Sequence, residues 1–265
     1  MHRKLQSITD KLSPVFLILI VLIVWQSVVS LGVVPNFMLP SPVQVVEAFV
    51  DDFSSLMENA ATSLQETFWG MLIAITLAFG SAYLMDRFRL VKKSLYPILI
   101  LTQTVPTVAI APLLVLWFGY DMSPKIILVV ISCYFPIAVG LLNGFTSADP
   151  DVINLMRTMG SSRWQIFCHV KMPYSLSNFF SGLRISVSYS VIGAVVAEWL
   201  GGNSGLGVYM TRVRKSYAYD RMFAVILLVS VISLVLMKLV DVLQRVCMPW
   251  EQSCREETSE STCQQ

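Results

Sequence analysis

The sequence has few charged residues and almost no histidine. Only 14% of its 265 residues are Asp, Glu, Lys or Arg, against about 25% in soluble domains, which argues against a soluble globule. The 19 Lys and Arg nearly balance the 17 Asp and Glu, leaving a net charge of +2, so the charge favours no nucleic-acid partner. The two histidines, His2 and His169, lie in different regions, which excludes a zinc-protease motif.

Sequence motifs typical of a metal site, a disulfide framework or a phosphate-binding loop are also missing. The 5 cysteines are odd in number and show no C-x-x-C spacing, which fits neither disulfides nor a structural zinc site. No G-x-x-x-x-G-K-S/T loop occurs, and the glycine cluster from Gly201 to Gly207 contains no lysine, so the chain does not hydrolyse ATP by that route. A Ser/His/Asp site would depend on His169 in a polar helix, which disfavours it. We expect no catalytic residue, metal ion or cofactor bound by this chain.

Long apolar runs are abundant. A helix of about 20 apolar residues crosses the hydrocarbon of a bilayer, and six runs are long enough, which predicts an all-α, polytopic membrane bundle with about six transmembrane helices. The runs are Pro14 to Val34, Ser63 to Met85, Leu95 to Phe118, Ile126 to Phe145, Phe179 to Leu200 and Phe223 to Cys247. The chain then divides into a cytoplasmic N-terminus (1–13), a transmembrane domain (14–250) and a polar cytoplasmic tail (251–265).

The first run could be confused with a signal peptide because basic residues precede it. Its length exceeds the 7–15 residues typical of a signal-peptide apolar core, and Ser30 to Gly32 is a poor cleavage site. We therefore expect a retained span. Most Lys and Arg then fall in cytoplasmic segments if the N-terminus is cytoplasmic, which the positive-inside rule favours.

One outer segment, between Leu200 and Phe223, departs from that rule. It contains Arg212, Arg214, Lys215 and Arg221. The segment is either a solvated loop outweighed by the other segments, or a docking patch for an acidic external partner. The sequence leaves the role of these cations open.

Residues 147–173 are too polar to cross a bilayer and predict a hairpin of two short helices. Asp149 can cap a helix that starts at Pro150, and Gly160 supplies the left-handed residue that ends it. Its apolar residues recur at helical spacing, at Val152, Leu155, Met156 and Met159.

The second helix of the hairpin has its own start and stop signals. Ser162 and Gln165 have the spacing of a capping box, and we expect Pro173 to end the helix. Two interpretations are open. The hairpin either packs on its own bundle or inserts into the groove of another protein.

A family resemblance lies in this hairpin. The run Asn154 to Gly160, followed by Trp164-Gln165 and Met172-Pro173, resembles the coupling motif of bacterial ATP-binding-cassette (ABC) importer permeases, often written E-A-A-x-x-x-G. Here Asn154 replaces the usual glutamate. In that family the segment seats in a cleft of the cytoplasmic ATPase. The resemblance implies the coupling residues Asn154, Arg157, Gly160, Ser162, Trp164 and Phe167.

Two further segments narrow the resemblance. Gln103 to Ala109, with Trp117-Phe118-Gly119, and Val196 to Gly202, with Gly205-Leu206-Gly207, resemble the nitrate, sulfonate, taurine and thiamine-precursor branch, as does Leu39-Pro40-Ser41-Pro42. The resemblance implies a multi-pass permease of the bacterial inner membrane, working as a homodimer. Its implied partners are a cytoplasmic ABC ATPase dimer, which holds ATP and magnesium, and an external substrate-binding protein.

The third apolar run is the leading candidate for the lining of a pathway. It contains Pro97, Pro106 and Pro112, and each proline frees a backbone carbonyl that protein or cavity water must satisfy. The candidate lining residues are Gln103, Thr104, Pro106, Thr107 and, in other spans, Asn143 and Glu198. The alternative for the hydroxyls is bonding to their own helix.

Glu198 ends the fifth run near the outer boundary of the membrane. It either gates the pathway, contacts the binding protein or only packs, and the glycines after it suggest a turn able to hydrate it. In the same run Gly182, Ser186, Ser190 and Ala194 form a ridge of small residues. Such a ridge permits close helix packing, and a dimer contact or pathway wall is the alternative.

The sequence thus predicts a subunit that translocates a small polar organic solute by alternating access, driven by a separate ATPase. A thiamine-precursor pyrimidine is the substrate that the resemblance favours, with a sulfonate or nitrate-type solute next. The alternatives are a passive channel and a membrane-embedded enzyme that uses Glu198 and Gln103.

Overall fold

The computed structural model describes residues 2–32, 34–35 and 38–249, and every regular element in that part of the chain is helical. This confirms the all-α class. The predicted tail, 251–265, lies outside the described residues. In chain order the elements are α1 (His2–Ser30), α2 (Pro42–Asp51), α3 (Phe53–Arg87), α4 (Arg89–Thr104), α5 (Thr107–Phe118), α6 (Met122–Thr146), α7 (Pro150–Thr158), α8 (Arg163–Ile166), the π turn η1 (Phe167–Lys171), α9 (Met172–Leu200), α10 (Leu206–Lys215) and α11 (Tyr219–Cys247).

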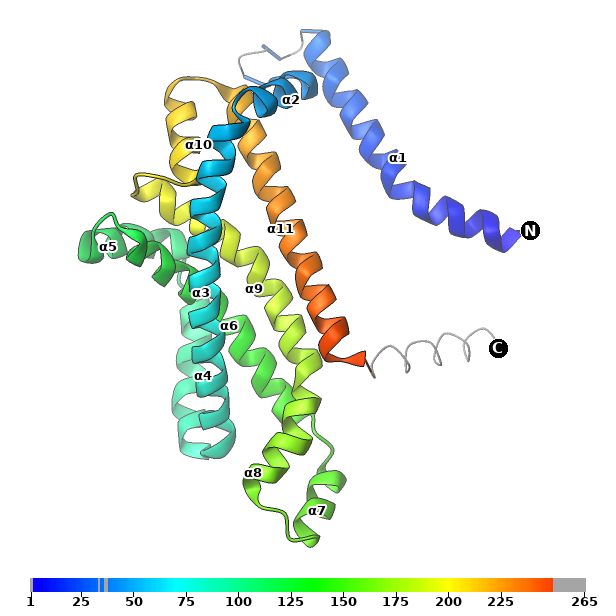
Figure 1. The fold of residues 1–265 in the computed structure, drawn as a ribbon, viewed down its shortest axis with the longest axis vertical. Helices are drawn as coiled ribbons and strands as arrows, with labels where there is room; N and C mark the ends of the chain where they lie inside the picture. The colour runs from blue at the N-terminus through cyan, green and yellow to red at the C-terminus, as the bar shows by residue number, and fades with distance from the viewer. Residues whose placement is uncertain (1, 33, 36–37, 250–265) are drawn as a thin grey trace.

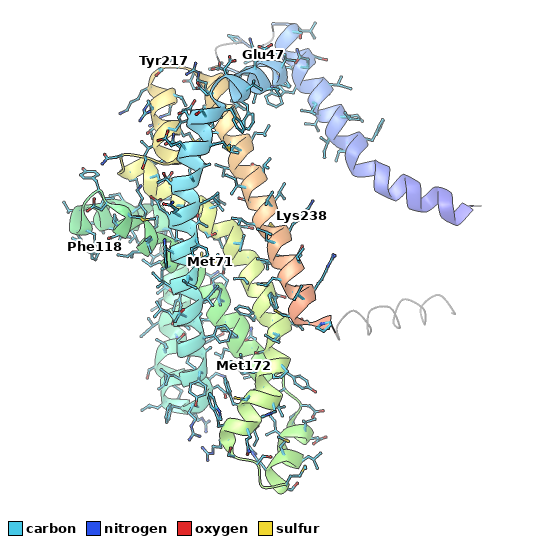
Figure 2. All side chains as sticks on the ribbon, viewed as in Figure 1. Glu47, Met71, Phe118, Met172, Tyr217 and Lys238 are labelled. Carbon is cyan, nitrogen blue, oxygen red and sulfur yellow. The ribbon has the colours of Figure 1, made fainter. Side chains whose placement is uncertain are left out.

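The helices form an elongated bundle with two distinct ends (Figure 1). α7 and α8 form one extremity, here named the hairpin end, and α2 and α10 form the other, here named the α10 end. Glu47 and Tyr217 lie at the α10 end, and Met172 lies toward the hairpin end (Figure 2). The long helices α3, α6, α9 and α11 run between the two ends.

Within the described residues, four helical segments are long and apolar enough to cross a bilayer. They are α3, α6, the continuous run Arg163–Leu200 and α11, and the pair α4 and α5 makes a fifth if it counts as one span. The first predicted span falls on α1, within which Phe16–Ser30 is the apolar part among the residues whose side chains are described. By length and composition the described residues thus support four or five spans, and each of the six predicted runs overlaps a helix.

The third predicted span, Leu95 to Phe118, is divided between two helices. α4 and α5 meet at an angle of 97°. The break falls at Val105 and Pro106, both with extended backbone. Proline lacks the N–H that would continue the α4 ladder and disfavours helical geometry in the residue before it, which accounts for the bend.

The core forms where α6 packs against α9 and α3. Glycines bring the backbones of α6 and α9 together, because a Cβ on Gly182 would lie 2.5 Å from the carbonyl oxygen of Pro136. The Ser186 hydroxyl donates to the Cys133 carbonyl at 3.0 Å. All four residues of the predicted small-residue ridge are buried. The ridge thus packs inside one chain against α6, as the packing interpretation expected.

α1 lies apart from the long helices (Figure 1). Its side chains from Phe16 to Val24 are exposed. Near its C-terminal end the Trp25 indole donates to the Pro40 carbonyl at 3.1 Å, and its ring lies 5.8 Å from that of Phe223. α1 is therefore attached to the bundle through its last turns.

Candidate functional site

The first helix of the hairpin begins and ends as predicted. The Asp149 carboxylate accepts the backbone N–H of Asp151 at 2.9 Å, and Pro150 occupies the first turn of α7. Gly160 adopts the left-handed conformation, with φ +81°. None of the α7 side chains is buried, and Leu155 and Met159 are 60% and 72% exposed. The apolar face of α7 is therefore only partly covered within its own chain, since Val152 and Met156 are half-buried and Leu155 and Met159 are exposed.

The second helix begins at the predicted capping box. The Ser162 hydroxyl accepts the Gln165 N–H at 3.3 Å, and the Gln165 side chain accepts the Ser162 N–H at 2.7 Å. The predicted stop at Pro173 is wrong, because the chain continues through the π turn η1 into α9. Pro173 occupies the first turn of α9, where a missing N–H is tolerated. The wider i→i+5 turn before it shifts the helix register by one residue.

Aromatic rings attach α8 and η1 to the bundle. The Phe167 ring lies 4.8 Å from that of Tyr83 on α3 and 5.2 Å from that of Phe145 on α6. Trp164 stacks on Phe167 at 5.7 Å yet remains 61% exposed. The packing interpretation thus holds for α8 and η1, and insertion of the hairpin into another protein stays a prediction.

The predicted coupling residues fall into two groups. Phe167 is half-buried against the bundle, whereas the other residues are exposed: Asn154, Arg157, Gly160, Ser162 and Trp164. Their role in coupling stays a prediction. Phe167 differs from them because its ring packs against Tyr83 and Phe145 of the same chain.

A cavity of about 360 Å³ lies where the α4–α5 bend faces α6 and α9. Its polar lining consists of Thr102, Gln103, Thr107, Ser132 and Tyr189, and the rest of its lining is Gly193 and the apolar residues Val105, Pro106, Val108, Ile131, Phe135, Pro136, Ile192 and Val196. None of these lining residues is charged. Three of the predicted pathway residues, Gln103, Pro106 and Thr107, are thus brought together.

The other predicted pathway residues lie elsewhere. The Thr104 hydroxyl donates to the Leu101 carbonyl of its own helix at 2.8 Å, the alternative considered for these hydroxyls. Asn143 is exposed toward the hairpin end of α6. Ser132 and Tyr189 were missed, because a single serine or tyrosine in an apolar span is not distinguished by periodicity.

Glu198 is buried at the α10 end, where it caps a helix. Its carboxylate accepts the Ser63 hydroxyl at 2.6 Å and the Gly207 N–H at 2.5 Å. The Ser63 oxygen also accepts the Leu206 N–H at 2.9 Å, and the Asn59 side chain accepts the Gly205 N–H at 3.0 Å. The N–H groups at the start of α10, which have no partner within a helix, are thus satisfied by α3 and α9.

The predicted hydration of Glu198 is wrong, since its exposure is 1%. Gly205, with φ +119°, approaches so closely that a Cβ would lie 2.3 Å from the Glu198 carboxylate. The glycine turn therefore serves close contact with the carboxylate rather than access of water.

A second buried pair lies beside Glu198. The Lys125 ammonium on α6 donates to the Glu66 carboxylate on α3 at 2.6 Å and to the Ser204 carbonyl at 3.3 Å. Glu66 is 1% exposed and Lys125 3%. This pair was not predicted from the sequence, although ionisable residues within or beside apolar runs are the available signal. Asn59, Ser63, Glu66, Lys125 and Glu198 are together named the buried network.

The cations between Leu200 and Phe223 lie largely on a helix rather than in a loop. Arg212, Arg214 and Lys215 occupy the last turn of α10, where cations interact favourably with the helix dipole. Arg221 pairs with Asp52 at 2.9 Å. The Tyr209 hydroxyl donates to the same carboxylate, and burial together with that hydrogen bond raises the pKa of Tyr209.

Comparison with known proteins identifies relatives over most of the chain. Residues 70–249 match the family described as "Binding-protein-dependent transport system inner membrane component". A "Probable ABC transporter permease protein" of Haemophilus influenzae is 37% identical over 87% of this chain and 94% of its own length. "Formylaminopyrimidine transport permease protein ThiX" of Halalkalibacterium halodurans is 33% identical, over 90% of this chain and 96% of its own length.

A solved structure shares the fold. The chain resembles one titled "Crystal structure of an amino acid ABC transporter with histidines" with a TM-score of 0.59, covering 75% of this chain and 94% of that one. The sequence identity is 16%, so this likeness bears on the arrangement of helices alone.

Proposed function

The chain belongs to the family of binding-protein-dependent transport system inner membrane components, the permease subunits of ABC importers, and we propose that it translocates a small polar organic solute by alternating access. One observation carries this proposal. The continuous helical run Arg163–Leu200 begins in the hairpin, lines the cavity with Tyr189 and Gly193, and ends beside the buried network at Glu198. A movement of the hairpin therefore acts directly on the cavity wall.

The partner that moves the hairpin is a separate ABC ATPase, which holds ATP and magnesium. The partly covered apolar face of the first hairpin helix supports this, because Leu155 and Met159 are exposed at the extremity of the bundle. A helix with such a face suits a groove in a second protein. The coupling contacts would come from Asn154, Arg157, Gly160, Ser162 and Trp164, with Phe167 anchoring them to the bundle.

The charge distribution supports the proposed orientation. With the N-terminus and the hairpin end in the cytoplasm, most cations lie inside, as the positive-inside rule requires. The α10 end then faces the external substrate-binding protein. A second copy of the chain completes the permease, as the family resemblance implies.

The cavity favours a neutral solute over an anion. Its polar groups are hydroxyls and the Gln103 amide, with the Tyr189 and Phe135 rings beside them, and none offers a counter-charge to a sulfonate. Placing an unpaired charge in such surroundings is costly. A pyrimidine of the thiamine-precursor type suits these groups, and one relative is named a formylaminopyrimidine permease. Other relatives are named for aliphatic sulfonates and taurine, which makes a sulfonate the second candidate.

Transport in reconstituted vesicles tests the proposal. Vesicles containing the chain and its ATPase should take up radiolabelled formylaminopyrimidine when ATP is inside and the binding protein is outside, and not when either is left out. Flux without ATP would identify a passive channel, and chemical conversion of the solute would identify an enzyme. Preferential uptake of taurine would overturn the substrate assignment alone.

The hairpin is tested by Gly160→Val, because a β-branched residue strongly disfavours φ +81°. We expect the ATPase to be lost on co-purification and uptake to fall with it. Gly80→Ala is the matched control, since a Cβ there meets no atom within 4 Å. Unchanged assembly of the Gly160→Val variant would overturn the coupling role.

A further inference from the structure

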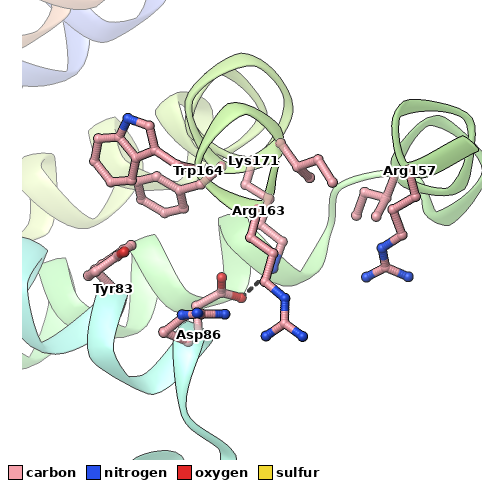
Figure 3. A pocket seen from close by; sticks show the side chains of 10 residues that line it. Tyr83, Asp86, Arg157, Arg163, Trp164 and Lys171 are labelled. Carbon is pink, nitrogen blue, oxygen red and sulfur yellow. Dashed lines mark hydrogen bonds and ion pairs between the residues drawn. The ribbon is translucent and has the colours of Figure 1, made fainter. Parts of the chain in front are cut away.

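A cavity of about 440 Å³ separates the end of α3 from the hairpin (Figure 3). Four cations line it, Arg87, Arg157, Arg163 and Lys171, and Asp86 is the one carboxylate among its lining residues. This cavity is named the basic pocket. Neither the cavity lined by Gln103 nor the buried network contributes a residue to it.

Most of the positive charge in the basic pocket is uncompensated. Lys171 pairs with Asp86 at 2.5 Å. Within the described part of the chain, no carboxylate forms an ion pair with Arg87, Arg157 or Arg163, which leaves three guanidinium groups without a counter-ion. The guanidinium groups of Arg157 and Arg163 extend from separate helices to the same side of the pocket (Figure 3). A concave site of one charge sign concentrates its potential and attracts the opposite charge.

The pocket lies at the depth of lipid headgroups. From Glu66 in the buried network to Asp86 is twenty residues of α3, or about 30 Å of helix, which equals the thickness of bilayer hydrocarbon. The buried network lies near the ends of the spans, since Lys125 and Glu198 fall within the first turn of α6 and the last turn of α9. Asp86 and its partner Lys171 then fall at the opposite boundary.

Aromatic residues mark the same boundary. The Tyr83 and Trp164 rings meet edge to face at 6.0 Å and both line the pocket. Tyrosine and tryptophan are enriched where hydrocarbon meets headgroups, because each has an apolar body and a polar tip. The pocket thus combines interfacial aromatics with unpaired guanidinium groups.

We propose that the basic pocket binds the phosphate of an anionic phospholipid in the cytoplasmic leaflet. Arginine forks bind phosphate oxygens bidentately, and basic pockets between membrane helices on the cytoplasmic side suit anionic headgroups. The orientation of this site rests on the proposed function. A lipid bound there bridges α3 and the hairpin, so the anionic lipid content of the membrane regulates how firmly the hairpin is held for the ATPase.

Native mass spectrometry of the purified chain, without the ATPase, tests binding directly. The chain is equilibrated with phosphatidylglycerol or phosphatidylcholine. We expect selective retention of phosphatidylglycerol, and an affinity loss of about twenty-fivefold in the double variant Arg87→Gln/Arg163→Gln, since each cation near an anionic surface contributes about fivefold. Arg89→Gln/Lys92→Gln is the matched control, because it removes the same charge from residues outside the pocket and should retain the lipid.

Three outcomes would overturn the proposal. One is equal retention of both lipids by the wild-type chain, and another is undiminished phosphatidylglycerol binding by the double variant. The third is displacement of the lipid by millimolar inorganic phosphate, which would identify a site for the free anion. If the double variant keeps the lipid but loses the ATPase on co-purification, the pocket is a docking site for acidic protein side chains instead. Because the lipid measurement omits the ATPase, failure of the coupling proposal leaves it unaffected.

Discussion

The two ends of the bundle use the same kinds of charged residue in opposite ways. At the α10 end, Glu66, Lys125 and Glu198 are 1–3% exposed and bonded to neighbouring helices. At the hairpin end, Arg157 and Arg163 are exposed and form no ion pair in the described structure. Buried charges that bond across helices fix the arrangement of those helices, whereas exposed charges without an ion pair are available to other molecules.

The largest expected effect is at Lys125. Lys125→Met leaves the Glu66 carboxylate buried without its counter-ion, so we expect a loss of about 3–5 kcal/mol in the free energy of unfolding. Thermal unfolding of the detergent-purified chain measures this loss. The matched control is Lys238→Met, which removes an exposed lysine from α11 and should change stability little. Equal stability of the two variants would contradict the structural role that we assign to the buried charges at the α10 end.

Ser63→Ala probes the same end without changing a charge. It removes the hydroxyl that joins Glu198 to the start of α10, leaving two buried polar groups short of a partner. We expect a loss of about 1–3 kcal/mol, visible as faster proteolysis around α10. Ser230→Ala is the control, since its exposed hydroxyl bonds only to the Ile226 carbonyl of its own helix. A loss of the same size in the control would contradict this interpretation.

Tyr209, at the α10 end, should make the stability of the folded chain depend on pH. Burial and the hydrogen bond to Asp52 raise its pKa, so the folded chain retains the phenol proton that the unfolded chain loses above about pH 10. Stability should therefore fall as pH rises above about 10, by at most about 1.4 kcal/mol per pH unit. Tyr209→Phe should flatten that part of a stability profile measured against pH. An unchanged slope in the variant would rule out Tyr209 as the source.

The smallest expected effect is at the hairpin end. Arg87→Gln/Arg163→Gln should change the free energy of unfolding by less than about 0.5 kcal/mol in a detergent without anionic lipid, because these exposed cations have no ion pair to lose. Chemical or thermal unfolding beside the Lys125→Met variant measures the contrast. A loss of several kcal/mol would show that the hairpin-end cations are structural as well.

Features encoded within a few residues were predictable from the sequence. The Asp149 cap, the Gly160 turn and the Ser162–Gln165 capping box each join residues at most three positions apart. Turn and cap preferences depend on local backbone geometry. The structure confirms each of these features.

Features that depend on residues distant in sequence were not predictable in this way. Lys125 and Glu66 are 59 positions apart, and Ser63 and Glu198 are 135 apart. Their pairing follows from how α3, α6 and α9 pack. A local rule also failed at Pro173, because its missing N–H is tolerated in the first turn of α9 after a π turn and does not end the helix.

The π turn determines the direction in which the hairpin side chains point about the axis of α9. Each residue of an α-helix turns the chain by about 100°, and a π turn adds one residue to the register. Deleting a single residue from Phe167–Lys171 would therefore swing Arg163 and Trp164 by roughly a quarter of a circle about the axis of α9. The Trp164 ring would leave Tyr83, while the cavity wall further along α9 stayed in place. One residue of the π turn therefore sets how far the hairpin is rotated, about the axis of α9, relative to the cavity wall.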